Sequence, residues 1–251
     1  MNELRAEIGR ALAQQFESDR LLGVRFVPIA PPQPVGLTAP PNATGKRQAG
    51  EAAKSDALAA LDKDHVQGCT KCTLCQTRTN TVFGAGAPSA RIVFVGEAPG
   101  FEEDRQGIPF VGRAGQLLTQ MIIAMGLKRE DVYICNVLKC RPPNNRDPAA
   151  DETTACRPYL YEQLRIIEPE LIIALGSPAA KLLLNTHEGI SRLRGRFHDF
   201  YPSGTPLSGK PIPLMPTYHP AYLLRTPADK GKAWSDLQMV MARLGLPLPR
   251  R

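Results

Sequence analysis

The stretch from Arg91 to Gly100, which reads RIVFVGEAPG, decides the fold of this chain. Its first half is a short apolar run of the kind that forms a buried strand, and the run ends in a glycine-rich turn. Similar apolar runs follow at residues 132–137 (VYICNV), 171–176 (LIIALG) and, in a shorter form, 212–217 (IPLMPT). These runs predict four buried strands, each followed by a polar turn.

Helical segments separate the predicted strands. Residues 114–125 and 228–244 repeat apolar side chains at helical spacing. Two further helices are predicted to begin at Asp147-Pro148 and Ser177-Pro178, where a capping residue precedes a proline at the first helical position. Strands that alternate with helices predict a three-layer α/β/α fold around a central, mainly parallel four-stranded sheet.

The beginning of the chain has a different character from the rest. Residues 1–22 place apolar side chains four residues apart, which predicts an N-terminal amphipathic helix. Residues 23–55 are rich in proline and alanine and could bury little, which predicts a flexible linker and, with the first helix, a disordered N-terminal extension. The folded domain is predicted to span residues 56–251, with a short helix at its start.

The net charge of +7 at pH 7 favours a polyanionic partner, above all a nucleic acid. Dispersed surface charge is the alternative interpretation. Apolar runs fall short of the ~18 residues that a membrane span needs, and residues 1–20 do not resemble a secretory signal. We therefore expect a cytoplasmic protein with no membrane partner, in which cysteines stay reduced and serve a metal, a cluster or catalysis.

Polar side chains follow the predicted strands. Ligands of parallel sheets bind at the carboxyl ends of the strands, and these ends lie at Glu97, Asn136, Ser177 and His219. An amide such as Asn136 can read a base edge, and a histidine can stabilise a developing oxyanion. Phe110 could stack on a flipped base. Taken singly, each is more often a cap or a core residue, so the prediction depends on their convergence.

Cysteines form two distant pairs. Cys69 and Cys72 are spaced as C-x2-C, and Cys140 and Cys156 follow much later. Cys75 forms a second C-x2-C with Cys72. A sixth cysteine, Cys135, lies in a predicted strand, where a buried thiol is usually inert. The spacing alone is compatible with a zinc ion or an iron–sulfur cluster.

Three motifs in order resemble those of the family 4 uracil-DNA glycosylases, the iron–sulfur type of the uracil-DNA glycosylase superfamily. GEAPG at 96–100, with GIPFVGRAG at 107–115, resembles the first motif of that family. NVLKCRPP at 136–143 resembles the middle motif, and HPAYLLR at 219–225 resembles the last. The resemblance extends over roughly residues 66–244 and implies an enzyme that hydrolyses the N-glycosidic bond of uracil in DNA, releasing uracil and leaving an abasic site for base-excision repair.

The resemblance also implies roles for individual residues. His219 stabilises negative charge on the O2 atom of uracil, and Asn136 distinguishes uracil from cytosine. Where other uracil glycosylases place an aspartate for the attacking water, this chain has Ala98, and Glu97 could substitute. The expected set comprises the catalytic residues Glu97 and His219 and the substrate-binding residues Gly96, Ala98, Phe110, Asn136 and, from its strand end, Ser177.

Two segments are predicted to contact DNA. The resemblance implies that the last motif enters the duplex and holds the base out, through Tyr222, Leu223, Leu224 and Arg225. The run SRLRGRFH at 191–198 carries three arginines in five residues, which favours a phosphate-contacting loop over a merely solvated turn. These arginines are Arg192, Arg194 and Arg196.

The resemblance implies a [4Fe–4S] cluster on Cys69, Cys72, Cys140 and Cys156, with a structural role and with Cys75 as a free thiol beside it. A relative of the family traps uracil-DNA covalently through a histidine in an arginine-rich insert, which is not apparent here, so we expect a turnover enzyme. The alternatives are a non-catalytic or covalent uracil-DNA-binding relative, and a nucleotide-binding enzyme, whose phosphate-loop spacing the chain lacks. We expect a monomer, in which the N-terminal helix could recruit a repair or replication partner.

Overall fold

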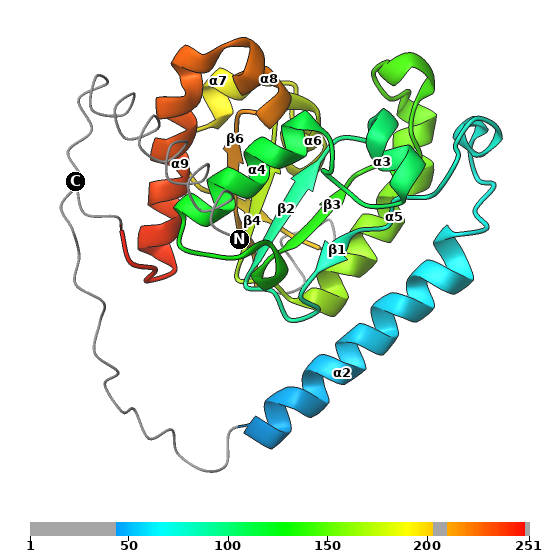
Figure 1. Cartoon of the computed structure of the whole chain (residues 1–251), viewed down its shortest axis with the longest axis horizontal. Coiled ribbons are helices and arrows are strands. Elements are labelled where there is room, and N and C mark those ends of the chain that lie inside the picture. The colour runs from blue at the N-terminus through cyan, green and yellow to red at the C-terminus, as the bar shows by residue number, and fades with distance from the viewer. Residues whose placement is uncertain (1–43, 203–209, 249–251) are drawn as a thin grey trace, which may run out of the picture. The chain divides into compact units, whose positions relative to one another are not determined.

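The computed structural model describes residues 44–202 and 210–248, with side chains from Gly50 onward. Contacts divide the chain into Met1–Pro41 and Asn42–Arg251, and the fold described below is that of the second unit (Figure 1). The N-terminal helix predicted over residues 1–22 lies outside the described residues. No helix in the described ranges has the length and apolar character needed to cross a membrane.

The described unit is built on a six-stranded sheet with the strand order β1-β3-β2-β4-β6-β5. The four central strands, β3, β2, β4 and β6, are parallel, as predicted, and the edge strands β1 and β5 are antiparallel. The prediction of four strands missed the two edge strands. These strands have only two and three residues, which is too short to show an alternating pattern. The strands are β1 Ala85–Gly86, β2 Ile92–Gly96, β3 Tyr133–Asn136, β4 Leu171–Leu175, β5 His198–Phe200 and β6 Ile212–Thr217.

Helices cover both faces of the sheet, which confirms the three-layer prediction (Figure 1). All residues of β2 are buried, but successive side chains enter two different cores, because side chains of a strand alternate between its faces. One core includes side chains of α2, α5 and α6, and the other includes side chains of α4 and α9. The α-helices are α2 Thr44–Leu61, α3 Phe101–Gln106, α4 Arg113–Ala124, α5 Ala150–Ile167, α6 Ser177–Leu184, α7 Ile190–Leu193, α8 Pro220–Arg225 and α9 Lys230–Arg243.

Helix α2 corrects the predicted domain boundary. It begins at Thr44, so the linker predicted over residues 23–55 is wrong from that residue onward, and the short helix expected at the start of the domain is much longer. The alanines of this segment favour a helix once prolines cease at residue 41. Leu58 and Leu61 are buried, and the Lys54 ammonium donates to the Ile167 carbonyl at 2.9 Å, which attaches α2 to α5.

Candidate functional site

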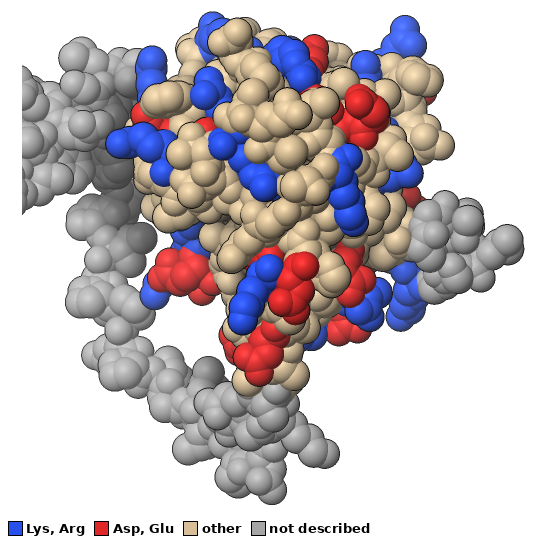
Figure 2. All heavy atoms as spheres, turned by 90° about the vertical axis from the view of Figure 1, so that its right-hand side faces the viewer, with Lys and Arg blue, Asp and Glu red and all other residues tan. Residues whose placement is uncertain are grey.

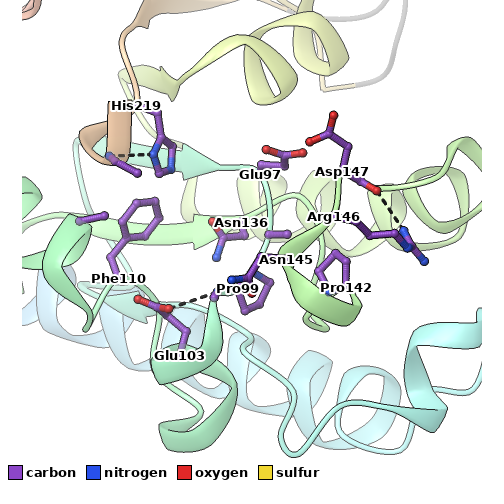
Figure 3. A pocket seen from close by; sticks show the side chains of 14 residues that line it. Glu97, Pro99, Glu103, Phe110, Asn136, Pro142, Asn145, Arg146, Asp147 and His219 are labelled. Atoms are coloured by element: carbon purple, nitrogen blue, oxygen red, sulfur yellow. Dashed lines mark hydrogen bonds between the residues drawn. The ribbon is translucent and has the colours of Figure 1, made fainter. Parts of the chain in front are cut away.

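A cavity of about 250 Å³ lies at the carboxyl ends of the central strands (Figure 3). Glu97 follows β2, Asn136 ends β3 and His219 follows β6, so three of the predicted strand-end side chains meet here. Ser177 does not line this cavity and borders a neighbouring one instead. The lining comprises Glu97, Ala98, Pro99, Gly100, Glu103, Phe110, Ala114, Asn136, Pro142, Asn145, Arg146, Asp147, His219 and Ala221.

The absence of a side chain at Gly96 lets the predicted base-reading residues come together. A Cβ atom at this position would lie 2.4 Å from Asn136 Oδ1 and 2.6 Å from Phe110 Cζ. Phe110 itself has a φ of +53°, a left-handed conformation that is uncommon for a bulky residue. Its ring centroid lies 5.6 Å from that of His219. The backbone here is therefore shaped to hold a flat aromatic face inside the cavity.

Glu103 fixes the two loops that carry this aromatic face. Its Oε2 accepts a hydrogen bond from the Gly100 N–H at 3.1 Å, and its Oε1 accepts from the N–H groups of Val111 at 2.9 Å and Gly112 at 3.0 Å. Glu103 is not among the predicted site residues. Its place at the third position of a helix that begins after Gly100 is the capping-box signal that could have indicated it.

Asn136 is almost fully buried, and its Oδ1 is an acceptor with no hydrogen-bond partner among the described residues. An unpaired buried acceptor is costly, so the group is suited to a ligand that donates a hydrogen bond to it. The Asn136 carbonyl accepts a hydrogen bond from the Lys139 ammonium at 2.8 Å, which fixes the backbone of Asn136. Lys139 is buried and also donates to Gln163 Oε1 at 2.6 Å. The sequence analysis missed both of these supporting residues.

His219 is presented to the cavity as a neutral hydrogen-bond donor. Its Nδ1 accepts from the Ala221 N–H at 3.1 Å, so the neutral ring carries its proton on Nε2. Burial lowers the pKa of His219 to about 4, and the positive charge of Arg225 acts in the same direction. The imidazole is therefore uncharged at neutral pH and offers an Nε2–H group.

Glu97 lies on the opposite side of the cavity from Phe110 and His219 (Figure 3). Its Oε1 is buried and has no hydrogen-bond partner among the described residues. Burial, together with the nearby negative charge of Asp147, raises the pKa of Glu97 to about 7. This carboxyl group can therefore exchange a proton near neutral pH.

The four predicted cysteine ligands, Cys69, Cys72, Cys140 and Cys156, line one small pocket. Arg78 Nη1 donates to Cys140 Sγ at 3.2 Å, and the Lys139 N–H donates to Cys156 Sγ at 3.2 Å. Cys75 does not line this pocket, and Cys135 is buried in β3. In the part of the chain that the structure describes, no three His, Cys, Asp or Glu side chains are grouped to hold a single metal ion.

The segment predicted to enter DNA is helix α8, and its residues differ in what they can contact. Leu223 is buried in a small core beside Leu117 and Ala233, which corrects its predicted role as a DNA-contacting residue. Tyr222 donates its hydroxyl to Asp229 at 2.6 Å. Leu224 and Arg225 are exposed. These last two residues remain the part of the predicted segment that is open to a partner.

The three arginines that were predicted to contact phosphate differ in exposure and in their partners. Arg192 and Arg196 are exposed, and Arg196 lies 3.8 Å from Glu188. Arg194 instead binds both carboxylate oxygens of Asp236, at 3.0 Å and 2.7 Å, and Asp236 is fully buried. Asp236 also accepts from the Thr217 hydroxyl at 2.7 Å. The guanidinium of Arg194 therefore joins its loop to α9 and β6, and its prediction as a phosphate contact is corrected accordingly.

Replacement of Arg194 by alanine should destabilise the fold by about 3 kcal/mol, because it leaves the buried Asp236 carboxylate without its cation. Replacement of the exposed Arg192 by alanine is the matched control and should change the unfolding free energy by less than about 0.5 kcal/mol. Urea unfolding of both variants measures the difference. Equal stability of the two would contradict the structural role of Arg194.

The family model described as "Uracil DNA glycosylase superfamily" matches residues 83–238, more than half of the chain, so the fold is that of this superfamily. Among similar proteins, a type-4 uracil-DNA glycosylase of Thermotoga maritima is 47% identical over 174 residues, which cover 69% of this chain and 86% of the relative. A type-4 uracil-DNA glycosylase of Archaeoglobus fulgidus is 45% identical over 188 residues, with coverages of 73% and 92%. The chain belongs to the type-4 uracil-DNA glycosylase family.

Proposed function

We propose that the protein hydrolyses the N-glycosidic bond of uracil in DNA, releases free uracil and leaves an abasic site as the first step of base-excision repair. The observation that supports this most directly is the unpartnered Oδ1 of the buried Asn136. Uracil carries a hydrogen on N3, whereas cytosine has a bare acceptor there. An asparagine whose oxygen faces N3 and whose amide faces O4 therefore accepts uracil and rejects cytosine.

The base is proposed to enter the cavity flipped out of the DNA stack. Phe110, fixed by its unusual backbone and by the Glu103 hydrogen bonds, supplies the face on which the uracil ring stacks. Stacking and the Asn136 contacts act on the ground state, so they orient the base and select it. They do not by themselves lower the barrier to bond cleavage.

Bond cleavage is proposed to depend on His219. When the bond between N1 and C1′ breaks, its electron pair moves onto uracil and negative charge develops on O2. The Nε2–H of His219 donates to that oxygen, and the hydrogen bond strengthens as the charge grows. A neutral donor whose own pKa is depressed to about 4 can provide this bond throughout the physiological pH range.

The DNA strand is proposed to lie over the cavity mouth, beside the exposed Leu224 and Arg225. Arg192 and Arg196 remain the proposed phosphate contacts of the basic loop. On the face that Figure 2 shows, Lys and Arg side chains are scattered among uncharged and acidic ones and do not form a single patch. The net positive charge thus supports general attraction to DNA, while position on the strand depends on the residues at the cavity.

The cysteine pocket fits the proposed [4Fe–4S] cluster. Its four lining thiols match the usual ligand set, and the Arg78 and Lys139 N–H groups already donate to two of the sulfurs, as they would to cluster-bound thiolates. Such a cluster takes one thiolate per iron, which suits sulfurs that surround a pocket without converging on one ion. When bound, it would tie the segment at Cys69 and Cys72 to the loop after β3 and to α5.

Replacement of Cys140 by serine should abolish the broad absorbance of the cluster near 400 nm and lower the unfolding free energy by several kcal/mol. Replacement of Cys75 by serine is the matched control, because Cys75 lies outside the cysteine pocket, and it should preserve both properties. Absorbance, iron analysis and denaturant unfolding of the two purified variants measure this. A colourless wild-type protein that contains zinc would refute the cluster.

The proposed activity is tested with an oligonucleotide that carries one uracil, with release of the free base and cleavage of the abasic site by alkali as the readouts. A matched oligonucleotide with cytosine is the control. A stable protein–DNA band on a denaturing gel would support a covalent relative instead, and binding without release would support a non-catalytic one. The covalent alternative would need a reactive histidine at the cavity. His198, the histidine of the basic run, contacts the Leu193 carbonyl and does not line the cavity.

The same proposal carries a location and a state of assembly with it. An enzyme that repairs the genome acts where the DNA lies, so we propose a cytoplasmic location. We also propose that it acts as a monomer. A repair or replication partner bound through residues 1–22 stays a prediction on residues outside those described.

A further inference from the structure

A second cavity, of about 350 Å³, adjoins the first, and Glu97 and Asp147 line both. The second cavity lies between the first turns of α5 and α6 and is bordered by Thr153, Ser177 and Lys181. Figure 3 shows the carboxyl groups of Glu97 and Asp147 next to each other, on the side of the first cavity away from Phe110 and His219. The two acids thus lie at the boundary that the cavities share.

Among the described residues, no side chain donates to the buried Oε1 of Glu97 or forms an ion pair with the exposed Asp147. The adjacent Arg146 is bound to Glu152 at 2.6 Å, so it is not the missing donor. Two neighbouring acceptors with no donor between them are a suitable site for a water molecule, whose two hydrogens can serve both.

The position of this pair also matches the chemistry that the reaction needs. Figure 3 shows both carboxyl groups on the side of the cavity away from Phe110 and His219. We infer that a uracil stacked on Phe110 and held by Asn136 and His219 directs its sugar toward that side. Ala98 leaves no carboxylate at the neighbouring turn position. Positive charge that develops on the sugar is stabilised by nearby anions, and the same anions can accept a proton from water.

Building on the proposed function, we propose that Glu97 and Asp147 together hold the attacking water, which enters from the second cavity. The water oxygen forms the new bond to C1′, and the electron pair of the bond between N1 and C1′ leaves with uracil. Glu97 takes one proton of the water, while Asp147 accepts a hydrogen bond from the other and stays ionised. The proton then passes from Glu97 to solvent or to the departing uracil anion, which returns the carboxylate to its starting state.

The pH dependence follows from which groups face Glu97. Asp147 is the acid beside it, Glu103, Arg146 and His219 share the first cavity, and Lys181 lies in the second. Burial and Asp147 raise the pKa of Glu97 to about 7, so the excision rate should rise with pH through that value as the carboxylate forms. Removal of the Asp147 charge alone should move this rise to lower pH, because one cause of the raised pKa is lost.

The test compares Asp147→Asn with Asp151→Asn, an exposed aspartate that lines neither cavity. Single-turnover excision is measured from pH 5 to pH 9, together with inhibition by free uracil. Asp147→Asn should lower the plateau rate roughly 10- to 100-fold and shift the midpoint downward, with inhibition by uracil unchanged. Asp151→Asn should match the wild type in all three measurements.

An Asp147→Asn plateau and midpoint equal to those of Asp151→Asn would overturn the water site and leave the proposed function intact. A wild-type protein that releases no uracil would overturn both. If Asp147→Asn weakened inhibition by uracil as strongly as it slowed excision, the residue would serve base binding, and the water site would again fail. Because Asp147 is exposed, the substitution should leave the fold unchanged, which circular dichroism checks.

Discussion

Replacement of His219 by alanine should slow uracil release roughly 100- to 1000-fold while leaving DNA binding nearly unchanged. The imidazole donates only to charge that develops as the base leaves, so its removal raises the barrier more than it weakens the ground-state complex. The Nε2–H is available because Nδ1 is occupied by the Ala221 N–H. Single-turnover rates at saturating enzyme, with a separate binding isotherm, measure the two quantities.

His198 is the matched control for this experiment. It is a half-buried histidine in β5 that contacts the Leu193 carbonyl and lies outside the cavity, so alanine at this position should leave excision within a few fold of the wild type. The wild-type rate should show no loss between pH 8 and pH 5 that is attributable to His219, because its pKa is about 4. Equal rates for the two variants would refute the proposed role of His219.

Replacement of Asn136 by aspartate should lower release of uracil by roughly three orders of magnitude and allow slow release of cytosine. Burial favours the protonated acid, whose hydroxyl can donate to the bare N3 of cytosine and whose carbonyl can accept from the N4 amino group. Uracil would lose the amide N–H that faces O4, and the acid replaces that donor only when its proton lies on the oxygen facing O4. Paired oligonucleotides that carry uracil or cytosine at one position measure the ratio of the two rates.

Asn144→Asp provides the control for this change, since Asn144 is exposed, does not line the cavity and has a left-handed backbone that aspartate tolerates. It should retain the wild-type preference for uracil. Unchanged selectivity of Asn136→Asp would show that base discrimination resides elsewhere. Loss of uracil release without any gain on cytosine would leave Asn136 as a determinant of affinity alone.

The strand ends could be predicted from the sequence because parallel strands deliver their carboxyl ends to one edge of the sheet. Glu97, Asn136 and His219 meet there as expected. Ser177 was predicted to join them by the same rule, but it opens α6 and borders the second cavity. The end of a strand predicts at which edge of the sheet a residue lies. The conformation of the following turn determines which cavity at that edge its side chain borders.

Contacts between distant segments could not be predicted in this way. Arg194 and Asp236 are 42 residues apart, and no local pattern connects them. From the sequence alone, Arg194 therefore could not be distinguished from an arginine that contacts phosphate. Leu223 was predicted to be exposed with the rest of its motif. In the structure it lies in helix α8 and its side chain is buried in a core. The boundary at Thr44 was missed because the prolines before it dominated the composition of the whole segment.

Lys139 links two parts of this protein that no single sequence motif connects. Its ammonium holds the carbonyl of Asn136, and its own N–H donates to Cys156, so one buried residue belongs to both the base-reading strand and the cysteine pocket. We expect a mutation at either end of this link to disturb the other end, because both ends are bound to the same residue. Selection for accurate choice of base should therefore also conserve Gln163 and Cys156, although neither lines the cavity that receives the base.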